Sequence, residues 1–459
     1  MGEERGSSGE NEKDLLVKDN KKLAHSGCSV LKPFLALLLL GVPLWLGLML
    51  PLTLLWKIVT LPCKLCKRPP KLNTPPEPAA PAERPAEQLD IVLFGATGFT
   101  GNLAARYVAK TYGTSVKWAI AGRRRSALEM LRAELAETTP ELSTSLRIIV
   151  CDSNDTAQLA GLVAQTKVVL TTVGPFARYG SSLVAACAAA GTHYCDITGE
   201  SDWVREMVDR HDDTCRRTGA RIVHFCGHDC VPWDIAVQAC AQKVAERGKG
   251  ERLSAVRCYD DMRGSASGGT IATVFESLQD RAQYRATACV DGSGKSFDPL
   301  LREAAPGSGR SGCATKANNQ SCCGYSDEGK AWVGPFVMAM VMANCIRRSN
   351  ALLGYGQKLK YYEAARYPSF PAAFVSVFGL VLFGTCLACP PLAWLLRTCV
   401  LPSPGQGPSE ATMNAGFLRV TVCAEGERGT TAKCSFYFPT DPVRALTHAC
   451  APTNDQLTI

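Results

Sequence analysis

Between residues 90 and 225, short apolar runs alternate with stretches in which apolar residues recur at helical spacing. The short runs predict buried strands, and the longer stretches predict helices with one apolar face. Because strands that alternate with helices form parallel sheets, we expect an α/β, Rossmann-type, doubly wound domain over residues 89–232. Strands are expected at 91–94, 117–121, 146–151, 167–173, 194–196 and 221–225, and helices at 102–110, 126–136, 180–190 and 202–217.

The pattern changes after Trp233. It predicts a helix to about 246, a strand at 253–259, a helix at 268–288 and a hairpin formed by 416–424 and 431–438. Residues 303–330 are rich in Gly, Ser, Ala and Asn, which is typical of a surface loop or an insertion. We therefore expect an α+β second domain with an antiparallel sheet, over residues 233–459.

Two long stretches carry no charge. Residues 33–56 exceed the roughly 20 residues that a spanning helix needs, and they predict a membrane anchor over 33–60, either as a span or as a hairpin bent at Pro43 and Pro51. Within the second domain, residues 367–400 contain the other stretch. A full span there would separate the following hairpin from its own domain, so a re-entrant or surface-lying segment is expected, with a buried core helix as the alternative.

The remaining N-terminal residues are polar. Residues 1–32 show no periodicity and predict disorder. Residues 61–88 are rich in proline and predict a stiff, extended linker. The lysines and arginines that follow residue 56 favour a cytosolic position for the domains after the anchor.

Composition excludes some partners. The chain has 459 residues, a net charge of +8 and 46% hydrophobic residues, which suffices for a sizeable core. No basic stripe interleaves with aromatic residues, so we expect no nucleic-acid partner. A membrane surface suits the positive balance, and nothing in the sequence indicates the oligomeric state.

A glycine motif separates the first strand from the first helix. The glycines would permit a tight turn, a close approach of a pyrophosphate to the backbone and close packing of helix on strand. The phosphates would then meet the N–H groups at the helix start. The predicted cofactor-binding residues here are Gly95, Ala96, Thr97, Gly98, Phe99, Thr100 and Gly101.

The ends of the next strands suggest which cofactor binds. Arg123 and Arg124 follow the second strand, where an NAD-binding domain usually carries an acidic residue, and guanidinium groups suit a 2′-phosphate. NADP is therefore expected rather than NAD, with a solvated helix start as the alternative. Asp152 ends the third strand and is expected beside the adenine. The run Val173, Gly174, Pro175 ends the fourth strand and is expected beside the nicotinamide.

Candidates for catalysis are less well defined. No Tyr-x-x-x-Lys pair follows the fourth strand, so no catalytic acid is assigned. Tyr179, Asp229 and Asp234 are the candidate catalytic residues, although either aspartate alone would equally suit a helix cap. The sequence His224-x-Cys226-x-His228-x-Cys230 has zinc-ligand types at strand spacing. Gly227 and Pro232 predict that the strand ends before these side chains converge, so no metal site is expected.

Several ordered motifs resemble the saccharopine dehydrogenase-like oxidoreductases over roughly residues 90–445. They are Phe94-Gly-Ala-Thr-Gly-Phe-Thr-Gly101, Val173-Gly-Pro175, Tyr194-Cys-Asp-Ile-Thr-Gly-Glu200, Gly227-His-Asp-Cys-Val-Pro-Trp-Asp234 and Arg347-Arg-Ser-Asn-Ala-Leu352. The chain departs from the family at His228 and Cys230, where phenylalanine and serine are usual, and it ends sooner after Asp441.

The resemblance implies a Rossmann domain joined to a substrate domain, with Arg347 and Ser349 as substrate contacts. It also implies attachment to membranes or lipid droplets, at the endoplasmic reticulum surface or on droplets. Because relatives include an enoyl reductase of glycolipid assembly, the implied activity is NADP-dependent hydride transfer to an apolar substrate such as a lipid. The alternative is a non-catalytic NADP-binding protein of the same membrane or droplet surface.

Overall fold

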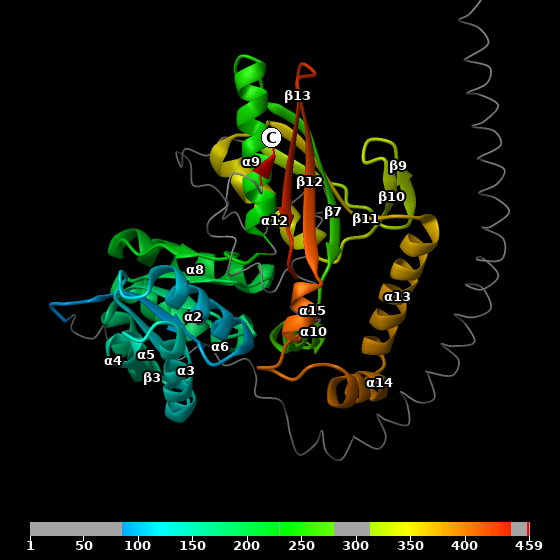
Figure 1. Ribbon diagram of the computed structural model, residues 1–459. Helices are drawn as coiled ribbons and strands as arrows, with labels where there is room; N and C mark the ends of the chain where they lie inside the picture. The colour runs from blue at the N-terminus through cyan, green and yellow to red at the C-terminus, as the bar shows by residue number, and fades with distance from the viewer. Residues whose placement is uncertain (1–84, 229, 280–312, 442–456, 459) are drawn as a thin grey trace, which may run out of the picture. The chain divides into compact units, whose positions relative to one another are not determined.

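The computed structural model describes residues 85–228, 230–279, 313–441 and 457–458 (Figure 1). The chain forms two compact units, and everything described below except the segment Thr385–Leu395 belongs to the larger one. The expected disordered start, the membrane anchor at 33–60 and most of the proline-rich linker lie outside the described residues.

A parallel six-stranded sheet confirms the Rossmann-type prediction. Its strand order is β3-β2-β1-β4-β5-β6, and each neighbouring pair is parallel. The strands are β1 Leu89–Phe94, β2 Trp118–Gly122, β3 Arg147–Val150, β4 Thr166–Thr171, β5 His193–Asp196 and β6 Ile222–Val223. The helices are α2 Phe99–Tyr112, α3 Arg125–Thr138, α4 Leu142–Ser145, α5 Thr156–Ala164, α6 Phe176–Tyr179, α7 Ser181–Ala190 and α8 Ser201–Thr218.

The strands of this sheet are apolar on both faces because both faces are covered. Along β1, Val92 and Phe94 belong to one apolar cluster, whereas Leu93 between them belongs to another. Since side chains alternate along a strand, these two clusters lie on opposite faces of the sheet. Helix α3 contributes Leu128 and Leu131 to the cluster that contains Leu93.

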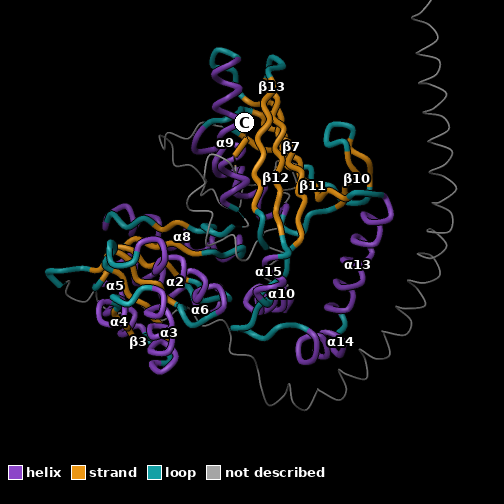
Figure 2. Tube along the Cα trace, viewed as in Figure 1, coloured by secondary structure: helices purple, strands orange, loops and turns teal. Residues whose placement is uncertain are grey.

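The second sheet is mixed, which corrects the prediction of an antiparallel sheet. Its order is β14-β13-β12-β7-β11-β10-β9, with β8 paired to β11 off this path. Figure 2 labels the strands β13, β12, β7, β11 and β10 of this sheet. Strand β11 runs parallel to both β7 and β8, whereas β12 is antiparallel to β7 and β13. The strands are β7 Leu253–Arg263, β8 Ala314–Ala317, β9 Gly324–Ser326, β10 Ala331–Gly334, β11 Lys358–Tyr367, β12 Phe417–Gly426, β13 Thr431–Phe438 and β14 Leu457–Thr458.

The structure confirms some of the predictions for the second region and contradicts another. The hairpin is confirmed as β12 and β13. The surface loop expected at 303–330 is wrong where it is described, because β8 and β9 lie within it, whereas the alternative of an insertion stays a prediction. The helix expected at 268–288 begins at Gly268, and its part beyond Gln279 lies outside the described residues. The helices are α9 Val231–Arg247, α10 Gly268–Gln279, α12 Ala339–Leu353, α13 Phe370–Ala388, α14 Pro390–Leu395, the π-helical turn η1 Leu396–Val400 and α15 Glu410–Asn414.

Helix α13 lies within the apolar stretch predicted at 367–400. Among the described residues it is the one helix long and apolar enough to cross a membrane, by length and composition alone. Only 6% of the apolar stretch of this helix is buried. The side chains of Val375, Phe378 and Val381 are 66%, 46% and 57% exposed. Within the described part of the chain, most of this helix is therefore exposed, although Ala373 is fully buried.

Candidate functional site

The glycine motif forms the turn between β1 and α2. Gly95 has a φ of +90°, which side chains disfavour, and its N–H donates to the carbonyl of Ala121 at 2.9 Å. A Cβ on Gly101 would lie 2.2 Å from the carbonyl oxygen of Gly95. The first and third glycines thus allow the turn and the close approach of helix to strand. The expectation from the sequence matches this geometry.

The second glycine has a different environment. Gly98 is the N-cap of α2, and a Cβ there would meet only the Gly95 carbonyl, at 3.3 Å. No side chain caps this helix, and its first turn holds no acidic residue. The N–H groups at a helix start have no partner within the helix, so this end suits an anion. The backbone here fits a pyrophosphate that a Gly98 side chain would displace.

The other residues of the motif surround the turn. Ala96 is fully buried, whereas Thr97, Thr100 and Phe99 are half-buried. The position of a Cβ on Gly122, at the end of β2, is 3.8 Å from the Thr97 hydroxyl. The glycine turn therefore lies next to the strand end that carries the arginines.

Two of those arginines form no ion pair with another described residue. Arg123 and Arg124 are exposed immediately after β2. Arg125 differs, since its Nε lies 3.0 Å from Glu129 Oε1 on the same helix. The guanidinium groups of Arg123 and Arg124 are consequently the ones available for a 2′-phosphate, as the sequence predicts.

One carboxylate oxygen of Asp152 forms hydrogen bonds within its own loop. Its Oδ1 accepts from the backbone N–H of Asn154 at 2.9 Å and from the Asn154 amide at 3.1 Å. Such a turn fixes the loop after β3 and leaves the other carboxylate oxygen without a hydrogen bond to a described residue. A contact of Asp152 with an adenine amine stays a prediction.

The loop after β4 carries the run expected beside the nicotinamide. The peptide bond between Gly174 and Pro175 is cis, and α6 starts directly afterwards. Glu200, which the sequence reasoning did not select, accepts from the backbone N–H groups of Phe176 and Ala177, both at 2.8 Å. Tyr179 ends α6, and the guanidinium carbon of Arg178 lies 5.3 Å from its ring centre.

A buried polar cluster lies at the ends of β5 and β6. Asp196 is fully buried, and its Oδ2 accepts from the Tyr194 hydroxyl at 2.8 Å and lies 2.7 Å from His224 Nδ1. Burial raises the pKa of Tyr194 well above its usual range, with the Asp196 charge adding to the effect. The sequence reasoning missed Asp196, although a polar residue that ends an apolar strand is a usable signal.

Comparison with known proteins decides the family. The saccharopine dehydrogenase NADP binding domain matches residues 91–223. A candidate trans-acting enoyl reductase of Mycobacterium tuberculosis is 36% identical over 347 residues, which cover 72% of this chain and 80% of the relative. The trans-acting enoyl reductase of Mycobacterium ulcerans is 34% identical over 352 residues, with the same coverage. This chain belongs to the saccharopine dehydrogenase-like oxidoreductases.

A solved structure also matches, at lower similarity. Saccharopine dehydrogenase (L-glutamate forming) from Saccharomyces cerevisiae matches with a TM-score of 0.40 and 13% identity, over 78% of this chain and 88% of that one. The NADP-binding domain of the present saccharopine dehydrogenase-like protein is the Rossmann sheet described above, and the matched range runs from β1 to β6.

The candidate catalytic and substrate-contact residues near α9 form hydrogen bonds with other side chains of this saccharopine dehydrogenase-like protein. Asp229 lies outside the described residues. Asp234 Oδ2 accepts from the Ser349 hydroxyl at 2.9 Å, which links α9 to α12, and burial raises the pKa of Asp234. Arg347 donates to the Asn344 side chain at 2.7 Å. Asp234, Ser349 and Arg347 therefore all take part in contacts between or within helices, and their substrate contacts stay predictions.

His228, one of the residues with zinc-ligand chemistry, is buried in an aromatic contact. His228 is 4% exposed, and its ring lies 5.1 Å from the ring of Phe438 in an edge-on contact. Burial lowers the pKa of His228 to about 4, so the imidazole is neutral at neutral pH. His224 is instead bound to Asp196, and the strand ends at Val223, before the two histidines could align. In the described part of the chain, no three His, Cys, Asp or Glu residues gather as metal ligands.

A pair of buried carboxyl groups lies in the second sheet. Asp260 on β7 and Glu363 on β11 are 1% and 0% exposed. Asp260 Oδ1 accepts from Trp233 Nε1 at 2.7 Å, and Glu363 Oε2 accepts from the Tyr361 hydroxyl at 2.9 Å. Burial raises the pKa of Asp260 to about 7, and burial together with the Asp260 carboxyl raises that of Glu363 well above its usual range. Burial therefore favours the protonated form of both carboxyl groups.

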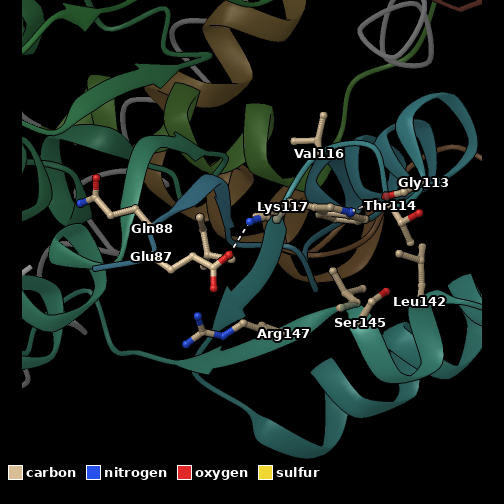
Figure 3. A pocket seen from close by; sticks show the side chains of 12 residues that line it. Glu87, Gln88, Gly113, Thr114, Val116, Lys117, Leu142, Ser145 and Arg147 are labelled. Carbon is tan, nitrogen blue, oxygen red and sulfur yellow. Dashed lines mark hydrogen bonds and ion pairs between the residues drawn. The ribbon is translucent and has the colours of Figure 1, made fainter. Parts of the chain in front are cut away.

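A cavity of about 200 Å³ lies elsewhere on the Rossmann domain (Figure 3). Gln88, Lys117 and Arg147 line it, and Lys117 pairs there with Glu87. These residues precede or begin β1, β2 and β3, so the cavity is at the amino ends of the strands. Because ligands of such sheets bind at the carboxyl ends, this cavity is separate from the predicted cofactor site.

Proposed function

We propose that this protein is an NADP-dependent reductase that transfers hydride to an apolar, lipid-linked substrate at a membrane or lipid-droplet surface. The observation that carries the proposal is the uncapped start of α2 at Gly98, beside the exposed Arg123 and Arg124. Phosphates suit the first feature, and a 2′-phosphate suits the second. Bound NADPH would supply the hydride.

The substrate class rests on two supports. Two similar relatives are named trans-acting enoyl reductases, so a carbon–carbon double bond conjugated to an acyl carbonyl is the proposed target. Helix α13 adds an exposed apolar face, which suits a lipid surface near which such acyl chains would be found. We place the protein on the endoplasmic reticulum or on droplets, with its Rossmann domain in the cytosol.

The test is consumption of NADPH by the full chain in lipid vesicles that contain long-chain enoyl thioesters. The expected result is oxidation of one NADPH for each double bond reduced, with the saturated thioester as product. If NADPH binds tightly but no enoyl thioester is reduced, the non-catalytic alternative is correct. That alternative has one observation in its favour: Asp234, a candidate catalytic residue, is already bound to Ser349.

Cofactor preference provides a separate prediction. Arg123→Glu should weaken NADPH binding about 100-fold, since a charge-assisted contact to the 2′-phosphate is worth about 1.5–3 kcal/mol and the new carboxylate would repel the phosphate. NADH, which lacks this phosphate, should lose far less affinity. Titration of each dinucleotide measures both constants.

Arg125→Ala is the matched control, because Arg125 is paired with Glu129. It should leave the ratio of the two affinities unchanged. Equal losses for NADPH and NADH in Arg123→Glu would show that Arg123 does not contact the 2′-phosphate.

A further inference from the structure

The carboxylate of Glu200, which lies outside the loop after β4, binds the end of that loop. Both oxygens of Glu200 accept from successive N–H groups at the start of α6: Oε1 from Phe176 and Oε2 from Ala177, each at 2.8 Å. A two-oxygen contact fixes orientation as well as distance. The cis Gly174–Pro175 peptide immediately precedes these N–H groups, so Glu200 fixes the loop expected beside the nicotinamide.

Glu200 is itself fixed to the end of β5. Its N–H donates to the Thr198 hydroxyl at 3.0 Å, and the Thr198 N–H donates to Asp196 Oδ1 at 3.1 Å. Asp196 in turn is held by Tyr194 and His224, as described above. Each step from the sheet to the loop is therefore a hydrogen bond from a partly or fully buried group.

Aromatic packing supports the same loop. The ring of Trp203 lies 5.8 Å from that of Phe176 and 5.2 Å from that of His224. Trp203 Nε1 also donates to the Ser181 hydroxyl at 2.9 Å, which connects α8 to α7. A Cβ on Gly180 would lie 2.7 Å from Trp203, so this packing leaves little room for the loop to shift.

We propose that Glu200 is a positioning residue for hydride transfer: it sets the placement of Gly174 and Pro175 against the nicotinamide, with the Asp196–His224 pair as its support. The proposal rests on the proposed function. In this fold the carboxyl ends of the central strands face the dinucleotide. A misplacement of about 1 Å at a reacting centre can slow a reaction about 100-fold, even when binding is preserved.

A plain helix cap elsewhere in the domain provides a matched control. Asp155 accepts from the N–H groups of Ala157 and Gln158, both at 3.0 Å, at the start of α5. Like Glu200, it is a carboxylate that accepts from two successive N–H groups at a helix start, here through Oδ1 alone, but its helix follows β3 rather than the loop after β4. If Glu200 acts only on stability, the two variants should behave alike.

The experiment compares Glu200→Gln with Asp155→Asn in the full chain. Both should show small, similar decreases in melting temperature. Only Glu200→Gln should lower kcat for NADPH-dependent reduction of an enoyl thioester, by about 10-fold to 100-fold, with the KM and the NADPH dissociation constant nearly unchanged. Glu200→Asp, whose shorter side chain keeps the charge, should recover only part of the rate.

A second measurement keeps this proposal separate from the proposed function. Fluorescence anisotropy and lifetime of the nicotinamide in bound NADPH report how firmly it is held, without any substrate. Glu200→Gln should reduce both relative to Asp155→Asn, even if no enoyl thioester is ever reduced. Identical kinetics and identical nicotinamide fluorescence in the two variants would overturn the positioning role.

Discussion

Gly98→Val should abolish NADPH binding and leave the protein folded. The backbone at Gly98 has a φ of −78° and a ψ of 165°, which any residue adopts, and the single close neighbour of a Cβ there is a carbonyl oxygen at 3.3 Å. The folded state therefore tolerates the side chain with a small adjustment. The isopropyl group would occupy the space through which a pyrophosphate approaches the first turn of α2. We expect the dissociation constant to rise at least ~100-fold, about 2.7 kcal/mol.

Calorimetric titration with NADPH measures this loss, and circular dichroism checks the fold. Gly161→Ala is the control, because Gly161 lies inside α5 and a Cβ there meets nothing within 4 Å. It should bind NADPH as the natural protein does. Retention of NADPH affinity in Gly98→Val would mean that the phosphates bind elsewhere.

In contrast to Gly98→Val, Gly101→Ala should cause a large loss of stability. The new Cβ would lie 2.2 Å from the Gly95 carbonyl oxygen and 2.8 Å from the Thr172 hydroxyl. The first is backbone in a tight turn and cannot rotate away, so α2 must move off β1. Overpacking of this kind costs about 3 kcal/mol, more than the ~1 kcal/mol that alanine gains over glycine within a helix.

Urea unfolding gives the free energy of unfolding for each variant. Gly161→Ala again serves as the control and should be as stable as the natural protein or up to about 1 kcal/mol more stable. An unchanged unfolding midpoint in Gly101→Ala would contradict the close approach of α2 to β1.

The Rossmann sheet was predictable because its information is local. Strand β1 and helix α2 follow directly from the apolar run and the glycines, and the observed ends lie close to the expected ones. Strand β6 was expected at 221–225 but ends at Val223, since Phe225 takes a φ of +60°. A single residue in a left-handed conformation leaves no trace in an apolar pattern.

The mixed second sheet depends on pairings that the pattern does not encode. Hairpin β12–β13 was predictable because a short turn joins its strands. The parallel pairing of β7 with β11 joins Ala255 to Lys360, which are far apart in the chain. Apolar alternation shows that a strand has a buried face, but it does not name the neighbouring strand.

The residues of the candidate site also differ in how far the sequence predicts them. Gly95, Gly98 and Gly101 form a motif within one turn, so the sequence identifies them. Glu200 meets Phe176 across two loops, and Asp196 meets His224 across two strands. Contacts of this kind arise from the sheet topology, which brings the ends of neighbouring parallel strands to one edge. These contacts could have been predicted only if the strand order had been known.

The buried Asp260–Glu363 pair makes folding take up protons near neutral pH. In the unfolded chain both carboxyls are ionised at neutral pH, whereas burial raises the pKa of Asp260 to about 7 and raises that of Glu363 as well, so the folded pair binds protons more tightly. His228 does not cancel this uptake there, because its imidazole is largely neutral in both states. Since the pKa of Asp260 is raised from 3.8 to about 7, its share of stability is present below pH 4 and is lost as the pH rises towards 7. Each molecule that unfolds at neutral pH therefore releases acid into its surroundings.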